Sequence, residues 1–240
     1  MLDGDYALSI LPKLLDGTWV TIQLVAVAFV FGMALAVGVA LLRVSPNPWR
    51  SGPAWLYIQV IRGTPLLVQI YLFYYGLGSL FARTPAIRHS VLWPYLREGF
   101  WYAVIALGVS TGAYAGEIIR GAIQAVPRGE IEAARSLGLR PRHVVWRIIL
   151  PRAIGMCLPA LGGETILTLK STALASTITV LDLMGQARFA KAQSLRLYEP
   201  LLEAALIYIL LTLLITRAFA FAEARMGRHR NPVRILNDAA

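Results

Sequence analysis

The sequence predicts an all-α membrane protein with five transmembrane helices. The chain has 240 residues, of which 57% are hydrophobic and only 15% are charged. Soluble domains rarely carry so few charges, so most of this surface must face lipid or other helices. Five apolar runs also reach the roughly 20 residues that a helix needs to cross a bilayer. Helices are expected because backbone polar groups in lipid must be satisfied within their own segment.

The predicted spans alternate with charged connecting segments. They cover residues 19–42, 54–80, 100–119, 154–180 and 201–222. The fourth run is the least uniform, because Glu164 and Lys170 interrupt it. Between the second and third runs, residues 83–99 combine charges with Trp93 and Tyr95. Aromatic side chains of this kind favour the membrane–water boundary, so we expect an external, partly interfacial loop.

The lysine and arginine distribution predicts an outer N-terminus and an inner C-terminus. In that orientation the inner segments hold 15 of these residues and the outer segments 7, with Lys170 inside the fourth span. The inner residues include Arg228, Arg230 and Arg234 near the end of the chain. Cytoplasmic loops of membrane proteins carry such an excess. Basic loops also explain the net charge of +10, so we expect no nucleic-acid partner.

Two further features limit the possibilities. Cys157 is the single cysteine, which excludes an intrachain disulfide and leaves no paired-cysteine metal motif, so we expect no metal site. Residues 1–16 are acidic and lack the basic start of a secretory signal, so we expect no cleaved signal peptide.

Residues 127–151 form a charged segment with a helix–turn–helix pattern. Glu130 to Leu137 is the first predicted helix, and it contains two alanines, which are strong helix formers. Gly138 then suits a left-handed helix end. Pro141 suits the first turn of a second helix. The segment also carries several arginines and therefore fits an acidic or polar surface.

The spacing within this segment is EAA-x3-G-x9-I-x-L-P. It resembles the EAA loop of the membrane subunits of bacterial ABC importers. In that family the loop docks into a cleft on a separate ATPase subunit. The resemblance implies that the ATPase-coupling residues are Glu132, Ala133, Ala134, Gly138, Leu150 and Pro151. The alternative is an ordinary amphipathic helix lying on the inner leaflet.

Four other runs resemble one branch of these permeases, which imports polar amino acids and opines. They are residues 62–69 (RGTPLLVQ), 114–121 (YAGEIIRG), 158–164 (LPALGGE) and 169–176 (LKSTALAS). The resemblance covers roughly residues 17–225 and is nearest to histidine-, arginine- and octopine/nopaline-type permeases. Gly163 and Ala173 depart from the branch pattern, which usually has Asn and Ser there.

The resemblance implies one transmembrane domain over residues 1–240, with a core at about 17–225 and the coupling loop at about 127–151. It implies a multi-pass protein of the bacterial inner membrane that pairs with a second permease (identical or homologous), ATPase subunits and a periplasmic solute-binding protein. The chain has no G-x-x-x-x-G-K-[ST] stretch to hold phosphates. We therefore expect no enzymatic activity and no cofactor on this chain, with ATP and Mg²⁺ on the partner ATPase.

Glu164 is the strongest candidate for the substrate pathway. A carboxylate inside a membrane span is expensive unless it is paired or faces water, so it indicates a pathway or a site. It would recognise a substrate ammonium or guanidinium, or else pair with a basic group of the protein or form a helix-end hydrogen bond. Gln69, Thr111 and Tyr114 would line an aqueous cavity, or else bond to neighbouring helices. Lys170 lies six residues after Glu164, on a different helix face.

Two features of the third span favour structural roles. Glu117 and Arg120 are three residues apart, where a helix-surface ion pair can form. Gly108, Gly112 and Gly116 recur every four residues and predict a packing seam. The seam's partner is either a helix of this chain or the second permease.

Two rival functions make different predictions. An ion-coupled secondary amino-acid transporter also uses intramembrane Glu and Lys, but it predicts inverted repeats and no EAA loop. A membrane scaffold or receptor that transports nothing needs neither the coupling spacing nor Glu164 in the bilayer. The sequence has the loop and shows no repeat, so it favours the importer permease.

Overall fold

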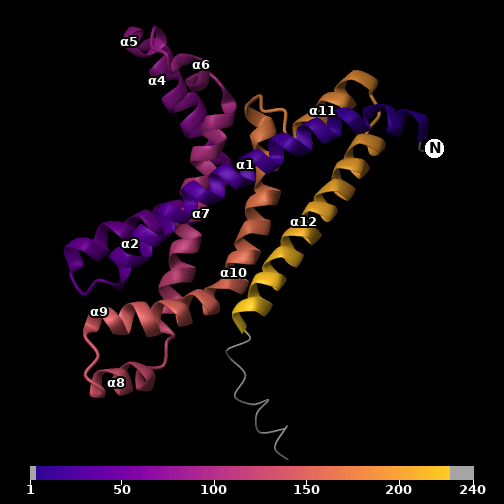
Figure 1. Cartoon of the computed structure of the whole chain (residues 1–240). Coiled ribbons are helices and arrows are strands. Elements are labelled where there is room, and N and C mark those ends of the chain that lie inside the picture. Colours follow the sequence, from indigo (N-terminus) through magenta and orange to yellow (C-terminus); the bar gives the residue numbers. More distant parts are fainter. Residues whose placement is uncertain (1–3, 228–240) are drawn as a thin grey trace, which may run out of the picture.

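The computed structural model describes residues 4–227, and the regular elements over this range are all helical (Figure 1). Their bounds are α1 (Gly4–Val44), α2 (Pro48–Gly63), α3 (Leu66–Tyr71), η1 (Leu72–Leu77), α4 (Gly78–Arg83), α5 (Pro85–Arg88), α6 (Trp93–Leu96), α7 (Gly99–Gln124), α8 (Arg128–Ser136), α9 (Pro141–Val144), η2 (Val145–Ile149), α10 (Leu150–Ser171), η3 (Thr172–Ile178), α11 (Leu183–Ser194) and α12 (Tyr198–Gly227). The elements η1 and η2 are π-helical, and η3 is a 3₁₀-helix.

Five helical segments are long and apolar enough to span a membrane, which confirms the predicted number within the described range. The first is longer than predicted, because α1 begins at Gly4 and not near Trp19. The added turns are amphipathic: Ile10 and Leu14 are buried against α11, whereas Lys13 is exposed. A hydropathy criterion misses such turns because their apolar residues form only one stripe.

The second predicted span, residues 54–80, is wrong in its bounds. The helix is interrupted after Gly63, because Thr64 has an extended backbone and a new helix begins only after Pro65. A residue before proline is driven out of the helical region by the proline ring, which explains the break. The candidate span is therefore Leu66–Arg83, built from α3, η1 and α4. Helix α2 instead runs beside α1 (Figure 1).

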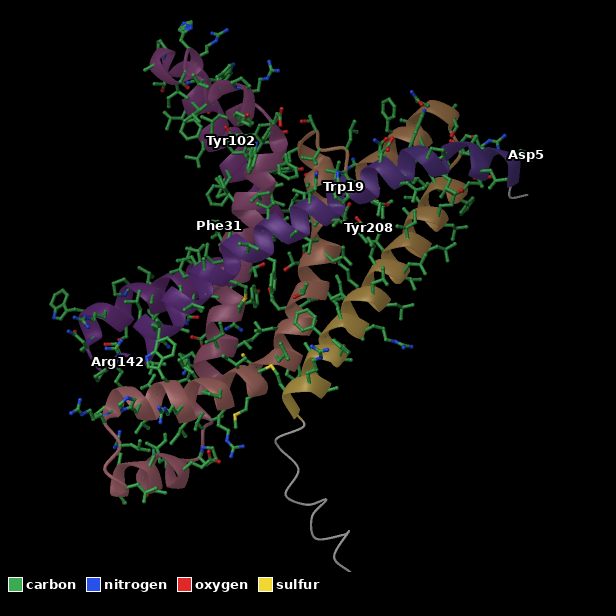
Figure 2. All side chains as sticks on the ribbon, in the orientation of Figure 1. Asp5, Trp19, Phe31, Tyr102, Arg142 and Tyr208 are labelled. Atoms are coloured by element: carbon green, nitrogen blue, oxygen red, sulfur yellow. The ribbon has the colours of Figure 1, made fainter. Side chains whose placement is uncertain are left out.

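The predicted glycine seam joins α7 to α1 of the same chain. A Cβ atom at Gly112 would lie 2.9 Å from the Leu35 Cβ, and one at Gly116 would lie 3.0 Å from the Val39 Cγ1. At Gly108 the added atom would collide with the Phe31 ring, which lies where the two helices cross (Figure 2). Small residues therefore let these two helix backbones approach closely.

The bundle has two ends with different elements. Helices α8 and α9 lie at one end, together with the C-terminal end of α12, and we name this the coupling end (Figure 1). The other, distal end carries α5, α6, α11 and the N-terminal end of α1. Figure 2 places Arg142 at the coupling end and Asp5 at the distal end. Arg228, Arg230 and Arg234, which we expect on the inner side of the membrane, lie outside the described residues.

Candidate transport pathway and coupling segment

A pocket between α7 and α10 contains three of the four predicted pathway residues. Its volume is about 240 Å³. Its lining residues are Leu66, Leu107, Ser110, Thr111, Tyr114, Glu164, Leu167, Thr168 and Ser171. Drug-sized ligands occupy roughly 300–1,000 Å³, so this pocket suits a smaller solute.

Hydroxyl groups fix the wall of this pocket beside Glu164. The Thr111 and Thr168 hydroxyl oxygens lie 3.0 Å apart and join α7 to α10. Thr168 also lies 3.0 Å from the Glu164 backbone carbonyl, to which it can donate. The Glu164 residue is only 8% exposed, yet its side chain lines the pocket. Among residues 4–227, no basic side chain lies within salt-bridge distance of this carboxylate.

Arg62 brings a positive charge to the same region. Its guanidinium carbon lies 5.0 Å from the centre of the Tyr114 ring, within cation–π range. Arg62 is the last arginine of α2, so the break before Pro65 places it near α7. The pocket therefore has a carboxylate in its wall and a guanidinium beside it.

Gln69 does not line this pocket. Its amide nitrogen donates to the Ile61 carbonyl at 2.8 Å and to the Thr64 hydroxyl at 2.9 Å. These bonds satisfy backbone and side-chain oxygens at the end of α2, where helical partners are missing. Gln69 is 5% exposed, and its Oε1 atom has no hydrogen-bond partner within the described range. These hydrogen bonds hold the α2–α3 break, and the part of Gln69 in the pathway stays a prediction.

Glu117 forms the predicted ion pair and a second one. Its carboxylate lies 2.7 Å from the Arg120 guanidinium and 3.5 Å from that of Arg43 on α1. The Glu117 carboxylate therefore links the ends of α1 and α7 that lie toward the coupling end. Lys170 is exposed on the other face of α10 from Glu164, beside Tyr208 of α12, as their spacing predicts.

The predicted coupling loop, residues 127–151, contains the expected helix, turn and second helix. Helix α8 ends in a Schellman motif: the Gly138 N–H donates to the Arg135 carbonyl at 2.9 Å, and the Leu139 N–H to the Ala134 carbonyl at 3.2 Å. Gly138 has φ +76°, a conformation that residues with a Cβ rarely adopt. Pro141 then begins α9.

The motif residues divide between a buried and an exposed group. Ala134 is buried, whereas Glu132 and Ala133 are exposed on α8. A groove of about 950 Å³ lies between α8, the start of α10 and the end of α12. Among the motif residues it is lined by Ala133, Ala134 and Pro151. Leu137 is 83% exposed at its rim.

The α7–α10 pocket presents hydroxyls, a carboxylate and a nearby guanidinium, which can bind a polar solute. In the described part of the chain, no group of three or more His, Cys, Asp or Glu residues could hold a metal. A pocket between membrane-spanning helices, together with an exposed helix–turn–helix, is the arrangement that the sequence led us to expect of a membrane-transport subunit.

Comparison with known families identifies the class of subunit. Residues 28–228 match the family described as binding-protein-dependent transport system inner membrane component. The chain belongs to this family, and it is therefore a multi-pass inner-membrane permease subunit and not an enzyme. Permeases of this family work with a separate ATPase, a binding protein and a second permease.

Curated relatives cover most of the chain. The octopine transport system permease protein OccM of Rhizobium radiobacter is 42% identical over 225 residues, covering 94% of this chain and 90% of the relative. The histidine/lysine/arginine/ornithine transport system permease protein HisM of Escherichia coli (strain K12) is 39% identical over 217 residues, covering 90% of each. The nopaline transport system permease protein NocM of Agrobacterium fabrum is 39% identical over 218 residues, covering 91% and 89%.

Solved structures share the fold. An amino acid ABC transporter crystallised with histidines is 36% identical, with a TM-score of 0.81 over 94% of this chain and 99% of that one. The MetNI methionine ABC transporter is 18% identical with a TM-score of 0.73 over 90% and 97%, which supports the fold alone. The ion-coupled transporter considered from the sequence is therefore set aside.

Sequence reasoning missed Arg62 and the hydroxyls of α10. Thr168 and Ser171 follow Glu164 at intervals of four and seven residues, so the helical period placed them on its face. That signal was present in the sequence. The approach of Arg62 to Tyr114 depends on how α2 packs against α7, and no local pattern encodes it.

Proposed function

We propose that this permease carries polar, chiefly cationic, amino acids or opines, and that the α7–α10 pocket is part of the pathway. The observation that carries the proposal is the Glu164 carboxylate, which shares one pocket with Thr111 and Tyr114. A buried carboxylate stabilises an ammonium or guanidinium that enters the pocket. The names of the octopine, nopaline and histidine/lysine/arginine/ornithine relatives support a substrate of this type.

Arg62 gives the pathway a complementary charge. An amino acid carries a carboxylate as well as its cationic group, and a guanidinium binds carboxylates through paired hydrogen bonds. The positive charge beside Tyr114 and the negative charge of Glu164 thus match the two ends of such a substrate. Gln69 acts on the pathway indirectly in this proposal, by fixing the α2–α3 break that positions Arg62.

The coupling end faces the cytoplasm in this proposal, and α8 docks on the ATPase that holds ATP and Mg²⁺. Support comes from the Schellman turn at Gly138, the exposed Leu137 and the excess of arginine in these segments. ATP-driven closure of the ATPase pair would move α8 and switch the pathway between inward-open and outward-open states. The whole chain acts as one transmembrane domain, with residues 127–151 as its coupling loop and a second permease completing the pathway.

Glu164→Gln tests the substrate site. The change keeps the shape of the side chain but removes its charge, and a charge-assisted hydrogen bond is worth about 1.5–3 kcal/mol. Uptake of a cationic amino acid into proteoliposomes should fall roughly 10- to 100-fold, with ATPase activity retained. Lys170→Gln is the matched control, because it removes a charge from a different face of α10, outside the α7–α10 pocket, and it should transport normally. Unchanged uptake by Glu164→Gln across a substrate titration would assign this residue a structural role.

A further inference from the structure

A two-point ion pair joins the coupling segment to a membrane-spanning helix. The Arg152 Nε atom donates to one Glu130 carboxylate oxygen at 2.9 Å, and the Arg152 Nη2 atom lies 2.9 Å from the other. Glu130 is in the first turn of α8, and Arg152 is in the first turn of α10. Neither residue belongs to the EAA spacing.

The backbone between Glu130 and Arg152 is irregular, so it would transmit a movement of α8 to α10 poorly. It passes through the turn at Gly138, the four-residue helix α9 and the π-helical segment η2. π-Helical segments are irregular and are frequently found at functional sites in helices. The ion pair bypasses all three elements and connects α8 to α10 directly. Paired hydrogen bonds between guanidinium and carboxylate fix direction as well as distance.

Helix α10 continues from this contact to the candidate pathway. Arg152 and Glu164 are twelve residues apart on one helix, which is about 18 Å at a rise of 1.5 Å per residue. Glu164 lies in the pocket wall. A movement of α10 at Arg152 would therefore shift that wall.

We infer that the Glu130–Arg152 ion pair transmits the movement of the coupling helix to α10 during the transport cycle. The two residues are positioning residues, since neither lines the α7–α10 pocket. The inference rests on the proposed docking of α8 on the ATPase and adds the contact through which that docking acts. Both side chains are partly exposed, at 34% and 42%, and exposed pairs add little to stability, so breaking the pair should leave the fold intact.

Charge removal and charge exchange test the pair. Glu130→Gln and Arg152→Gln should each lower the substrate transported per ATP hydrolysed by roughly 2- to 30-fold, the range for mutations along a coupling route. The exchanged variant Glu130→Arg/Arg152→Glu should restore most of this ratio. The readout is the purified complex in proteoliposomes with its binding protein, where transport and ATP hydrolysis are measured together. Glu223→Gln and Arg217→Gln are matched controls on α12, and both should keep the wild-type ratio.

Two outcomes overturn the inference. A wild-type ratio in both single variants would show that the pair transmits nothing. An exchanged variant as defective as the single ones would show that the residues act separately, for example on the ATPase.

Cross-linking adds a test that does not depend on losing activity. Glu130→Cys and Arg152→Cys in a Cys157→Ser background can be joined by a short bis-methanethiosulfonate, which links the two thiols through reducible disulfides. If the two helices move together, the cross-linked complex should still couple ATP hydrolysis to transport. Loss of transport on cross-linking, reversed by a reductant, would mean that α8 and α10 must separate.

Failure of this inference can be told apart from failure of the proposed function. If Gly138→Val transports normally, the coupling role of α8 is wrong, and the proposed role of the ion pair is wrong as well. If Gly138→Val abolishes transport while the ion-pair variants behave as wild type, only the transmission through Glu130 and Arg152 is wrong.

Discussion

The two ends of the bundle satisfy their polar groups in different ways. At the distal end, Asp182 is fully buried and caps α11 by accepting a hydrogen bond from the Gly185 N–H at 2.9 Å. The Tyr208 hydroxyl lies 3.5 Å from the other carboxylate oxygen, and Thr21 of α1 accepts from the Leu183 N–H at 3.0 Å. These contacts join α1, α11 and α12 into one body.

At the coupling end, helix α8 buries little of its surface within this chain. Ala134 is the buried residue of α8, and most of that helix is exposed, including Glu132 and Ala133. Leu137 also projects from it. The comparison teaches that α11 at the distal end is held by side chains of α1 and α12, whereas α8 at the coupling end leaves most of its surface uncovered within this chain. An element that must move with another protein needs such a surface and few internal constraints.

The largest expected effect comes from breaking the turn at the coupling end. Gly138→Val places a β-branched residue at φ +76°, which strains the backbone by about 1–2 kcal/mol or more. Helix α8 should then present its surface at the wrong angle. We expect transport in proteoliposomes to fall by roughly 5- to 150-fold, the span of typical coupling energies.

A matched substitution shows whether the turn itself is responsible. Gly52→Val on α2 adds the same side chain where nothing lies within 4 Å and φ is not positive, so it should transport normally. Membrane insertion of both variants is checked by immunoblotting of washed membranes. Wild-type transport by an assembled Gly138→Val complex would remove the coupling assignment.

A smaller effect is expected at the distal end, where pH should alter stability through Asp182. Burial raises the pKa of this carboxyl from 3.8 to about 6, against the opposing effect of its hydrogen bonds. The folded chain therefore binds a proton that the unfolded chain releases between these pH values. The stability contribution of Asp182 is highest below about pH 3.8 and is lost as pH rises to about 6.

Asp182→Asn isolates this contribution because the other acidic groups are unchanged. Two pKa units correspond to about 3 kcal/mol at most, so the wild type should gain up to that much relative to Asp182→Asn as pH falls from 7.5 to 4. Thermal unfolding midpoints of both proteins in detergent, measured across this range, provide the check. Parallel pH profiles for the two proteins would show that Asp182 is not held as a buried carboxylate.

The sequence predicted those features that depend on local pattern. Apolar runs gave the number of spans, and Gly138 with Pro141 gave the helix–turn–helix, because hydropathy and helix ends are encoded within a few residues. Glu117 and Arg120 were also paired by spacing alone. The glycine repeat predicted close packing, although its partner helix α1 emerged only from the fold.

Features that depend on packing between distant segments escaped prediction. The amphipathic start of α1 is stabilised by α11, which lies far along the chain. The role of Gln69 as a cap depends on the break at Pro65, a helix-ending signal that the apolar run 54–80 concealed. Arg62 reaches Tyr114 only because α2 turns back along the bundle. Such contacts follow from tertiary structure and not from the period of any one helix.

The most direct test of the account is the side of the membrane on which each end lies. Single cysteines replace Ser90 at the distal end and Gly129 at the coupling end, each in a Cys157→Ser background, and intact cells are treated with a membrane-impermeant thiol reagent. The account predicts that the cysteine at position 90 is labelled, whereas that at position 129 is labelled only after the cells are opened. Labelling of position 129 from outside, with position 90 protected, would place α8 away from ATP and contradict the coupling mechanism.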